Sequence, residues 1–189
     1  MYIPKHFEIT DETLINKFIE ENSFGQLISI QDGALTATHL PFLFDQQRNL
    51  LIGHLAKANP QWQQIDDQEV LVTLQGGHAY VSPSWYSSAG VPTWNYQAVH
   101  ISGIAKSFTD SDKLKQVVDA LTTQNEAAYE HPWVPDYAAS MLGGIVGIEI
   151  EISSKQCKFK LSQNRSETDR TGVKKQLGAG GHETLSGAM

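Results

Sequence analysis

A run in which apolar and acidic residues alternate constrains the fold of this chain most strongly. Residues 148–152 read Ile-Glu-Ile-Glu-Ile, and residues 157–161 repeat the alternation as Cys-Lys-Phe-Lys-Leu. Because successive side chains of a β-strand point to opposite faces, each run predicts a half-buried strand. A sheet with one face on a core is therefore expected, and Cys157 is expected to be a small core residue and not a reactive thiolate.

Earlier parts of the chain predict further strands joined by short turns. Gln31-Asp32-Gly33 is a hairpin signal, since Asp-Gly readily adopts the positive φ angles that tight turns need. Pro41 inside the second strand implies a sheet edge or a bulge, because proline cannot donate to the ladder. Gly76-Gly77 permits a sharp bend between two strands. The expected strands cover residues 24–30, 34–44, 50–54, 69–75, 78–81 and 98–108.

Apolar stripes at helical spacing predict a few peripheral helices. Thr10 is expected to cap the first helix, and Asp110 or Ser111 the second. A short helix over residues 137–142 and a final helix over residues 166–177 complete the expectation. An antiparallel meander with so few helices predicts a mainly β fold, a small antiparallel barrel with peripheral helices.

The length and charge of the chain narrow its organisation and its partners. With 189 residues, one domain is expected over residues 1–177, followed by a Gly-rich, mobile tail over residues 178–189. The formal net charge of −7 weighs against a general DNA-coating protein, which would show a basic surface. The first residues lack the apolar core of a signal peptide, and no run approaches the length of a membrane span. We therefore expect a cytoplasmic protein that does not enter a membrane.

The stretch Gly53–Trp62 is the first candidate for a binding site. It follows an apolar strand end, and Asn59-Pro60 is typical of a helix start. His54, Lys57 and free backbone N–H groups gathered at such a turn would suit an anion, above all a phosphate. A solvated connector with an exposed lysine is the alternative, and the local residues alone favour that alternative.

Other residues that could carry chemistry form no recognisable catalytic or metal motif. His39, like His54, lies near a strand end, and both would face one cleft if their strands are neighbours. No pair of histidines has i, i+4 spacing, so no metal site is expected. No Gly-x-Ser-x-Gly elbow is present, and no catalytic residue can be assigned. A Pro/Gly-rich loop holds four aromatic residues that could cap the barrel, seal a dimer interface or stack on a flat ligand: Trp85, Tyr86, Trp94 and Tyr96.

Several short strings of residues carry a family resemblance that extends from the first residue to about Leu177. They are Met1-Tyr2-Ile3-Pro4, HLPFLFD at 39–45, GHLAKANPQW at 53–62, YVSPSWY at 80–86, VPTWNY at 91–96 and KLSQN at 160–164. Together they resemble the PaiB-type FMN-binding negative transcriptional regulators. The resemblance implies an antiparallel split β-barrel of the superfamily that includes pyridoxamine-phosphate oxidases, and a homodimer with FMN at the subunit interface. It also implies a role in repressing sporulation and degradative-enzyme genes in bacilli.

The resemblance further implies which residues hold FMN. His54, Lys57 and Asn59, with local backbone N–H groups, would bind the phosphate, while Thr38 and His39 would lie along the flavin ring or the ribityl chain. Lys57 stands where the family usually has arginine, which keeps the charge but loses the bidentate fork. The other contacts would come from the aromatic loop and the last strand: Trp85, Tyr86, Trp94, Tyr96, Lys160 and Gln163.

The resemblance leaves more than one function open. Negative transcriptional regulation rests on it entirely, since the chain shows no helix-turn-helix signature and no basic stripe, and DNA contact would be direct or through a partner. An FMN-dependent oxidoreductase is the alternative, because the superfamily fold permits one. A dimer that only stores or senses flavin is a third reading. Another flavin or haem could also take the place of FMN.

Overall fold

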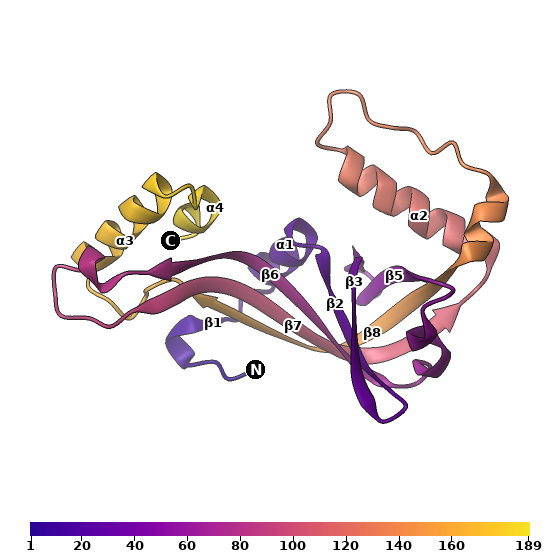
Figure 1. Ribbon diagram of the computed structural model, residues 1–189, viewed down its shortest axis with the longest axis horizontal. Coiled ribbons are helices and arrows are strands. Elements are labelled where there is room, and N and C mark those ends of the chain that lie inside the picture. Colours follow the sequence, from indigo (N-terminus) through magenta and orange to yellow (C-terminus); the bar gives the residue numbers. More distant parts are fainter. The chain divides into compact units, whose positions relative to one another are not determined.

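A computed structural model describes residues 1–189 and shows a mainly β protein with few helices (Figure 1). The strands are β1 (Glu8–Ile9), β2 (Phe24–Gln31), β3 (Ala34–Pro41), β4 (Leu43–Asp45), β5 (Leu50–Ala56), β6 (Glu69–Val81), β7 (Thr93–Phe108) and β8 (Ile145–Lys160). The α-helices are α1 (Glu12–Glu21), α2 (Ser111–Glu126), α3 (Glu167–Ala179) and α4 (Glu183–Gly187). Short 3-10 helices are η1 (Lys5–Phe7), η2 (Pro60–Gln64), η3 (Pro83–Trp85) and η4 (Ala139–Gly144).

The strands form one sheet in the order β3-β2-β6-β7-β8-β5-β4, and β1 also pairs with β8. The pairs β2–β3, β4–β5, β5–β8 and β1–β8 are all antiparallel. The predicted hairpin is confirmed, since Asp32 has φ 51° and Gly33 has φ 77° in the turn between β2 and β3. Pro41 is the last residue of β3, which is an edge strand of the sheet. The lack of a backbone N–H at this position costs the sheet no hydrogen bond.

Two compact units make up the chain. Unit 1 comprises residues 1–18, 74–100 and 156–189, and unit 2 comprises residues 19–73 and 101–155. Strands β6, β7 and β8 contribute residues to both units. The single domain expected over residues 1–177 stays a prediction.

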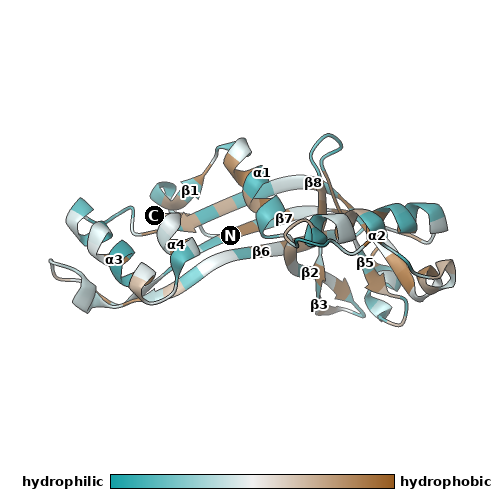
Figure 2. Cartoon of the chain, turned by 90° about the horizontal axis from the view of Figure 1, so that it is seen from above, coloured by the Kyte–Doolittle hydropathy of each residue, from teal (hydrophilic) through white to brown (hydrophobic).

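In unit 2, α2 covers the face of β5 that carries the even-numbered residues. Ile52 of β5 packs with Val117 and Leu121 of α2, as the predicted apolar stripe of this helix requires. Asp110 caps α2, because its side chain accepts a hydrogen bond from the backbone N–H of Lys113. Figure 2 shows that α2 is otherwise largely hydrophilic, while hydrophobic residues concentrate in the strands.

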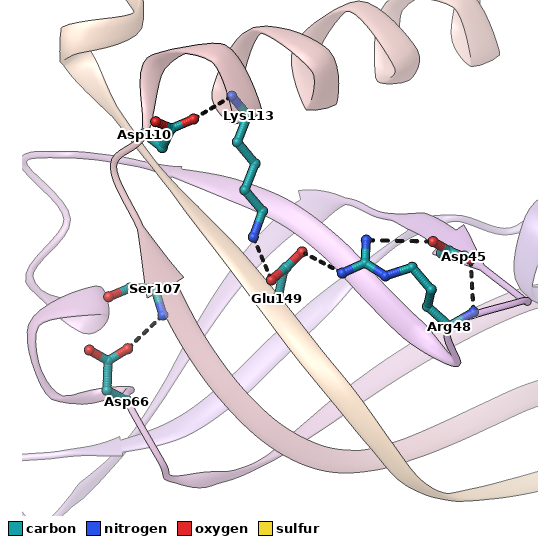
Figure 3. A network of polar contacts seen from close by, with 7 residues as sticks. All are labelled: Asp45, Arg48, Asp66, Ser107, Asp110, Lys113 and Glu149. Carbon is teal, nitrogen blue, oxygen red and sulfur yellow. Dashed lines mark hydrogen bonds and ion pairs between the residues drawn. The ribbon is translucent and has the colours of Figure 1, made fainter.

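A group of polar contacts ties the start of α2 to the sheet of unit 2 (Figure 3). The ammonium of Lys113 lies 2.7 Å from Glu149 Oε2 on β8, and Arg48 reaches the other oxygen of Glu149 at 3.8 Å. Asp66 accepts a hydrogen bond from the backbone N–H of Ser107 at 2.5 Å, next to the end of β7. Glu149, expected on the solvent-facing side of its strand, therefore anchors a helix.

Strand β8 is one continuous strand where the sequence predicted two. Ile148, Ile150 and Ile152 are buried, as the alternation required. In the second run Cys157 is buried as expected, and burial raises the pKa of its thiol to about 12. Lys158 departs from the pattern, because it is only 8% exposed although it was expected to face solvent.

The predicted bend at Gly76-Gly77 is wrong, since β6 runs through both residues. Neither glycine has a positive φ. A Cβ added at Gly77 would lie 3.1 Å from the Cβ of Leu185 in α4. Glycine serves here to let a helix approach the strand closely and not to turn the chain.

The tail over residues 178–189, which was expected to be mobile, is helical over part of its length. It contains α4, which lies beside α3 (Figure 1), and the Ser186 hydroxyl donates to the Lys174 carbonyl at 3.0 Å. Leu185 is buried, and Arg170 donates to the carbonyl of Met189 at 2.8 Å. The Gly-rich composition concealed this packing because one apolar residue carries most of it.

Side chains at the helix starts cap the helices, and one predicted cap is corrected. The predicted cap Thr10 is wrong, because Asp11 Oδ1 accepts the backbone N–H groups of Thr13 and Leu14. Ser166 caps α3 by accepting from the backbone N–H of Asp169. None of the helices combines the length and the apolar character that crossing a bilayer requires.

Shortening the buried side chain of α4 tests whether the tail is folded. Leu185→Ala should lower the free energy of unfolding by about 2–4 kcal/mol, because it leaves a cavity against β6. Urea denaturation measures this change, with Thr184→Ala on the exposed side of the same helix as the control. Equal stability of the two variants would mean that the tail does not pack on unit 1.

Candidate functional site

The turn after β5 is held by a short helix start that the sequence indicated. The chain leaves β5 at Ala56 and enters η2 at Pro60, which occupies the first turn of that helix. Asn59 caps η2, because its Oδ1 accepts the backbone N–H of Gln61 at 3.0 Å. Proline costs nothing at this position, since the first N–H groups of a helix have no partner within it.

A buried amide joins this turn to the β2–β3 hairpin. Gln61 is only 1% exposed, and its Oε1 accepts the hydroxyl proton of Thr38 at 2.6 Å. Its Nε2 donates to Ser29 Oγ at 2.9 Å, while Asn59 Nδ2 donates to Thr38 Oγ1 at 2.9 Å. The structure thus brings the predicted residues Thr38 and Asn59 together around Gln61. Sequence reasoning missed Gln61, and its place directly after the Asn-Pro helix start was the only available signal.

Three backbone N–H groups of this turn are already bonded within the chain. Those of Lys57 and Asn59 donate to the carbonyls of Gly144 and Ala56, at 2.8 and 2.9 Å. The N–H of Gln61 goes to the Asn59 cap. These three N–H groups are therefore not the free backbone donors that were expected at this turn. What remains available is the ammonium of Lys57, which is exposed and makes no ion pair or hydrogen bond within the chain.

Thr38 and His39 lie on opposite faces of β3. Thr38 pairs with the buried Leu27 in the hairpin register, whereas His39 pairs with Gln26. The His39 ring stacks on Phe24, and its Nε2 lies 3.0 Å from Gln26 Nε2. Because the side-chain period of a strand is two, adjacent residues cannot share a face. One flat ligand along β3 would therefore meet only one of the two side chains.

His54 points to a different place from the Gln61 amide. It lines a cavity of about 360 Å³ in unit 2 whose other walls are Pro41, Val118, Leu121, Thr122, Asn125, Glu126 and Trp133. His39 is not among these walls. The Nδ1 atom of His54 is buried without a hydrogen-bond partner. Burial lowers the pKa of His54, so its imidazole is neutral at pH 7.

The aromatic residues of unit 1 form separate contacts and not one stack. Trp94 is 54% exposed and meets the rings of His78 and Tyr80 across β6 and β7, with centroids 6.4 and 6.2 Å apart. The Tyr86 ring is covered by the Arg165 guanidinium at 4.3 Å, and its hydroxyl is buried without a partner. Tyr96 has the ammonium of Lys158 at 5.4 Å from its ring centroid.

Three cations gather near these rings without a carboxylate in ion-pair contact, and we call Lys158, Lys160 and Arg165 the basic cluster. Lys160 Nζ donates to Thr93 Oγ1 at 2.5 Å and to the Trp94 carbonyl at 2.6 Å. Burial, followed by the charges of Lys158 and Arg165, lowers the pKa of Lys160. Lys158 donates to the Tyr2 carbonyl at 3.0 Å. Lys160 is thus the predicted residue of the last strand that retains an unpaired charge.

Gln163, the second residue predicted there, is used inside its own turn. Its Oε1 accepts the backbone N–H of Leu161 at 2.6 Å, and its Nε2 donates to the Phe159 carbonyl at 2.5 Å. Both ends of the amide therefore serve to end β8.

A buried carboxylate holds the aromatic loop to α3. Asp169 accepts hydrogen bonds from the backbone N–H and hydroxyl of Ser87, at 2.7 and 2.8 Å, and from the Ser88 hydroxyl at 2.6 Å. These bonds, that of Ser88 first, hold the pKa of Asp169 well below its usual range. A Cβ added at Gly172 would lie 2.7 Å from the Trp85 carbonyl oxygen, so α3 approaches the loop closely. No local signal connects residues so far apart in sequence.

Neutralising this carboxylate should loosen the loop in a pH-dependent way. A carboxyl with a depressed pKa stabilises the folded state above its ordinary pKa and loses that contribution as pH falls. Asp169→Asn should be less stable than the parent protein at pH 7, and the difference should shrink toward pH 2. Thermal unfolding across this range measures it, with the exposed Asp112→Asn as the control. A difference that is constant with pH would contradict the anchoring role.

Comparison with known proteins gives a consistent result. The model of the family described as "Putative FMN-binding domain" matches residues 1–154. The chain is 43% identical over 185 residues to the "Protease synthase and sporulation protein PAI 2" of Bacillus subtilis, a match that covers 94% of this chain and 89% of that protein.

Two solved structures share the fold at low sequence identity. The FAD and heme binding protein from Mycobacterium smegmatis has a TM-score of 0.68 at 12% identity, over 87% of this chain and 78% of that chain. The flavocytochrome Anf3 from Azotobacter vinelandii has a TM-score of 0.65 at 15% identity, over 90% and 78%. With the antiparallel sheet, this likeness confirms the predicted split-barrel fold.

Proposed function

This chain belongs to the FMN-binding domain family, whose model spans residues 1–154, and on that premise we propose that it is a homodimeric FMN-binding negative transcriptional regulator of the PaiB type. The observation that carries the proposal is the 43% identity, over 94% of the chain, to a Bacillus subtilis protein named for protease synthesis and sporulation. The regulators that the sequence resembles repress the transcription of genes for both processes. FMN is the cofactor of the family. The proposal concerns what the protein does with bound FMN.

The residues present fit FMN, which needs a cation for its phosphate and aromatic surface for its rings. Of the three residues assigned to the phosphate, His54 faces another cavity and Asn59 is bonded to Thr38, whereas the ammonium of Lys57 is free. The family match also includes Lys57 and ends before the basic cluster. We therefore assign the phosphate to Lys57, with the Gln61 network holding the turn in place.

The aromatic residues of unit 1 would enclose the rings of the cofactor. Trp94 offers an exposed face, and the Tyr86 hydroxyl is a buried donor without an acceptor. Lys160 supplies positive charge close to Trp94. The resemblance implies a homodimer with FMN at the subunit interface, and we propose that these groups close the site from the partner subunit.

Phosphate binding at Lys57 can be separated from ring binding by comparing two flavins. Lys57→Ala should weaken FMN binding about tenfold or more, because a hydrogen bond to a charged group contributes about 1.5–3 kcal/mol. It should leave the weaker binding of riboflavin, which lacks the phosphate, unchanged. Quenching of flavin fluorescence measures both affinities. Lys106→Ala, which removes another exposed lysine of unit 2, is the matched control. A larger loss of FMN affinity in Lys160→Met would move the phosphate to the basic cluster.

An exposed apolar face of the β2–β3 hairpin supports the homodimer. Leu35 is 79% exposed and lies opposite Ile30, while Phe24 is 64% exposed on the same face. β3 is at the edge of the sheet order, where uncovered apolar side chains favour association. A second copy of the chain would bury this face.

Placing charge on that face should separate the subunits. Leu35→Lys should convert a dimer to a monomer in sedimentation velocity, because the ammonium would be buried without a partner. Lys5→Ala, at an exposed residue of unit 1, serves as the control. A dimer that persists in Leu35→Lys would place the interface elsewhere.

The regulatory role is tested by binding to DNA, with the protein alone and with added cell extract. The net charge of −7 means that any DNA contact depends on a local positive patch or on a partner. A gel shift on the region upstream of the gene that encodes this chain, at stated salt, should show a retarded band with the protein or with protein plus cell extract. If neither sample retards this DNA, the proposed repression at this region is contradicted.

An FMN-dependent oxidoreductase is the second candidate, and the structural likeness to solved flavin-binding proteins favours it. FMN, when bound, supplies two-electron redox chemistry. Anaerobic bleaching of the flavin absorbance by NADH or NADPH would support this function, and an unchanged spectrum would support a protein that only binds the cofactor.

A further inference from the structure

The cavity lined by His54 presents side-chain oxygen acceptors that the chain leaves unpaired. Thr122 spends its hydroxyl proton on the Val118 carbonyl at 2.8 Å. Asn125 spends an amide proton on the Leu121 carbonyl at 2.7 Å. The side-chain oxygens of both residues remain without a donor from the chain. A molecule entering this space would therefore meet oxygen lone pairs at the C-terminal end of α2.

Glu126 adds the one formal charge in the cavity wall. Its Oε2 accepts the backbone N–H of Trp133 at 2.8 Å, which fixes the loop after α2 across the opening. Its Oε1 accepts no hydrogen bond within the chain. No lysine or arginine lines the cavity. The one formal charge of the lining is therefore negative, and the carboxylate has an oxygen left for a donor.

His54 also lines the cavity, and its Nδ1 is buried without a partner. Desolvation keeps the imidazole neutral, so it adds no positive charge to oppose a cation. Between the polar walls lie the apolar side chains of Pro41, Val118 and Leu121, with the Trp133 ring at the rim.

We propose that this cavity binds a small organic ammonium or amidinium cation with an apolar body. Its N–H groups would donate to Glu126 and to the oxygens of Thr122 and Asn125. The apolar body would lie on Val118, Leu121 and the face of Trp133, where a cation also gains from the ring. A volume of about 360 Å³ is in the range of pockets that hold small molecules.

A matched set of probes tests the charge that the cavity selects. Benzylamine, benzyl alcohol and benzoate share a ring and differ in the charge of one group. Titration into the full-length protein, followed through the Trp133 indole signal in ¹H–¹⁵N NMR spectra, should show saturable shifts with benzylamine and weaker ones with benzyl alcohol. Tighter binding of benzoate than of benzylamine would overturn the proposal.

Variants then locate the site. Glu126→Gln should weaken benzylamine binding about tenfold while leaving benzyl alcohol unchanged, since only the charged hydrogen bond is lost. Glu130→Gln, an exposed acid on the loop that follows α2, is the control and should bind like the parent protein. Glu126→Asp, which keeps the charge, separates a loss of the site from a loss of loop structure. Equal effects of Glu126→Gln and Glu130→Gln would overturn the proposal.

The cavity is separate from the FMN site assigned to Lys57, and the same titration tests this separation. FMN-loaded protein should bind benzylamine as well as the flavin-free protein does. Displacement of benzylamine by FMN would overturn the proposal and would place the cofactor in this cavity. Failure of Lys57→Ala to weaken FMN binding would contradict only the phosphate assignment, so the two outcomes are separable.

Discussion

The side-chain amide of Gln61 is the interaction on which the candidate site of unit 2 depends. A buried amide must be fully hydrogen-bonded, because an unpaired polar atom in the interior costs about 1–3 kcal/mol. Gln61 meets this requirement through Thr38 and Ser29, and so it ties η2 to the β2–β3 hairpin. The turn that carries Lys57 is therefore tied to the hairpin by these bonds. A cation at a rigid turn can serve as a binding group without the loss of backbone freedom that a loose loop would incur.

The polar groups of the chain divide into those that hold the fold and those left over. The backbone donors of the Lys57 turn, the amide of Gln163 and the carboxylate of Asp169 are all consumed by internal bonds. The ammonium of Lys57, the Nδ1 of His54 and the hydroxyl of Tyr86 are not. The proposed FMN contacts draw on the second group, with Lys57 proposed for the phosphate and Tyr86 for the flavin ring system.

Unit 1 shows how a flexible sequence is made rigid by distant contacts. The loop that carries Trp85 and Tyr86 has few residues that favour helix or strand, yet Asp169 fixes it through Ser87 and Ser88. The close approach of Gly172 to the Trp85 carbonyl allows α3 to serve as the support. Aromatic side chains on such a loop lose little freedom when a ligand binds, which suits them to enclose a planar cofactor.

The amino-acid sequence by itself determined the elements whose causes are local. The alternation in residues 148–152, the Asp-Gly hairpin, the Asp110 cap and the Asn-Pro helix start all follow from neighbouring residues, and the family motifs identified the cofactor. Only the tertiary structure decided which side chains meet. It put Thr38 and His39 on opposite faces of one strand, turned His54 toward α2, joined Gln61 to Thr38 and packed Leu185 on Gly77. The physical reason is that spacing along the chain specifies the face on which a residue lies, whereas strand order and helix packing, set by the whole core, specify what lies across from that face.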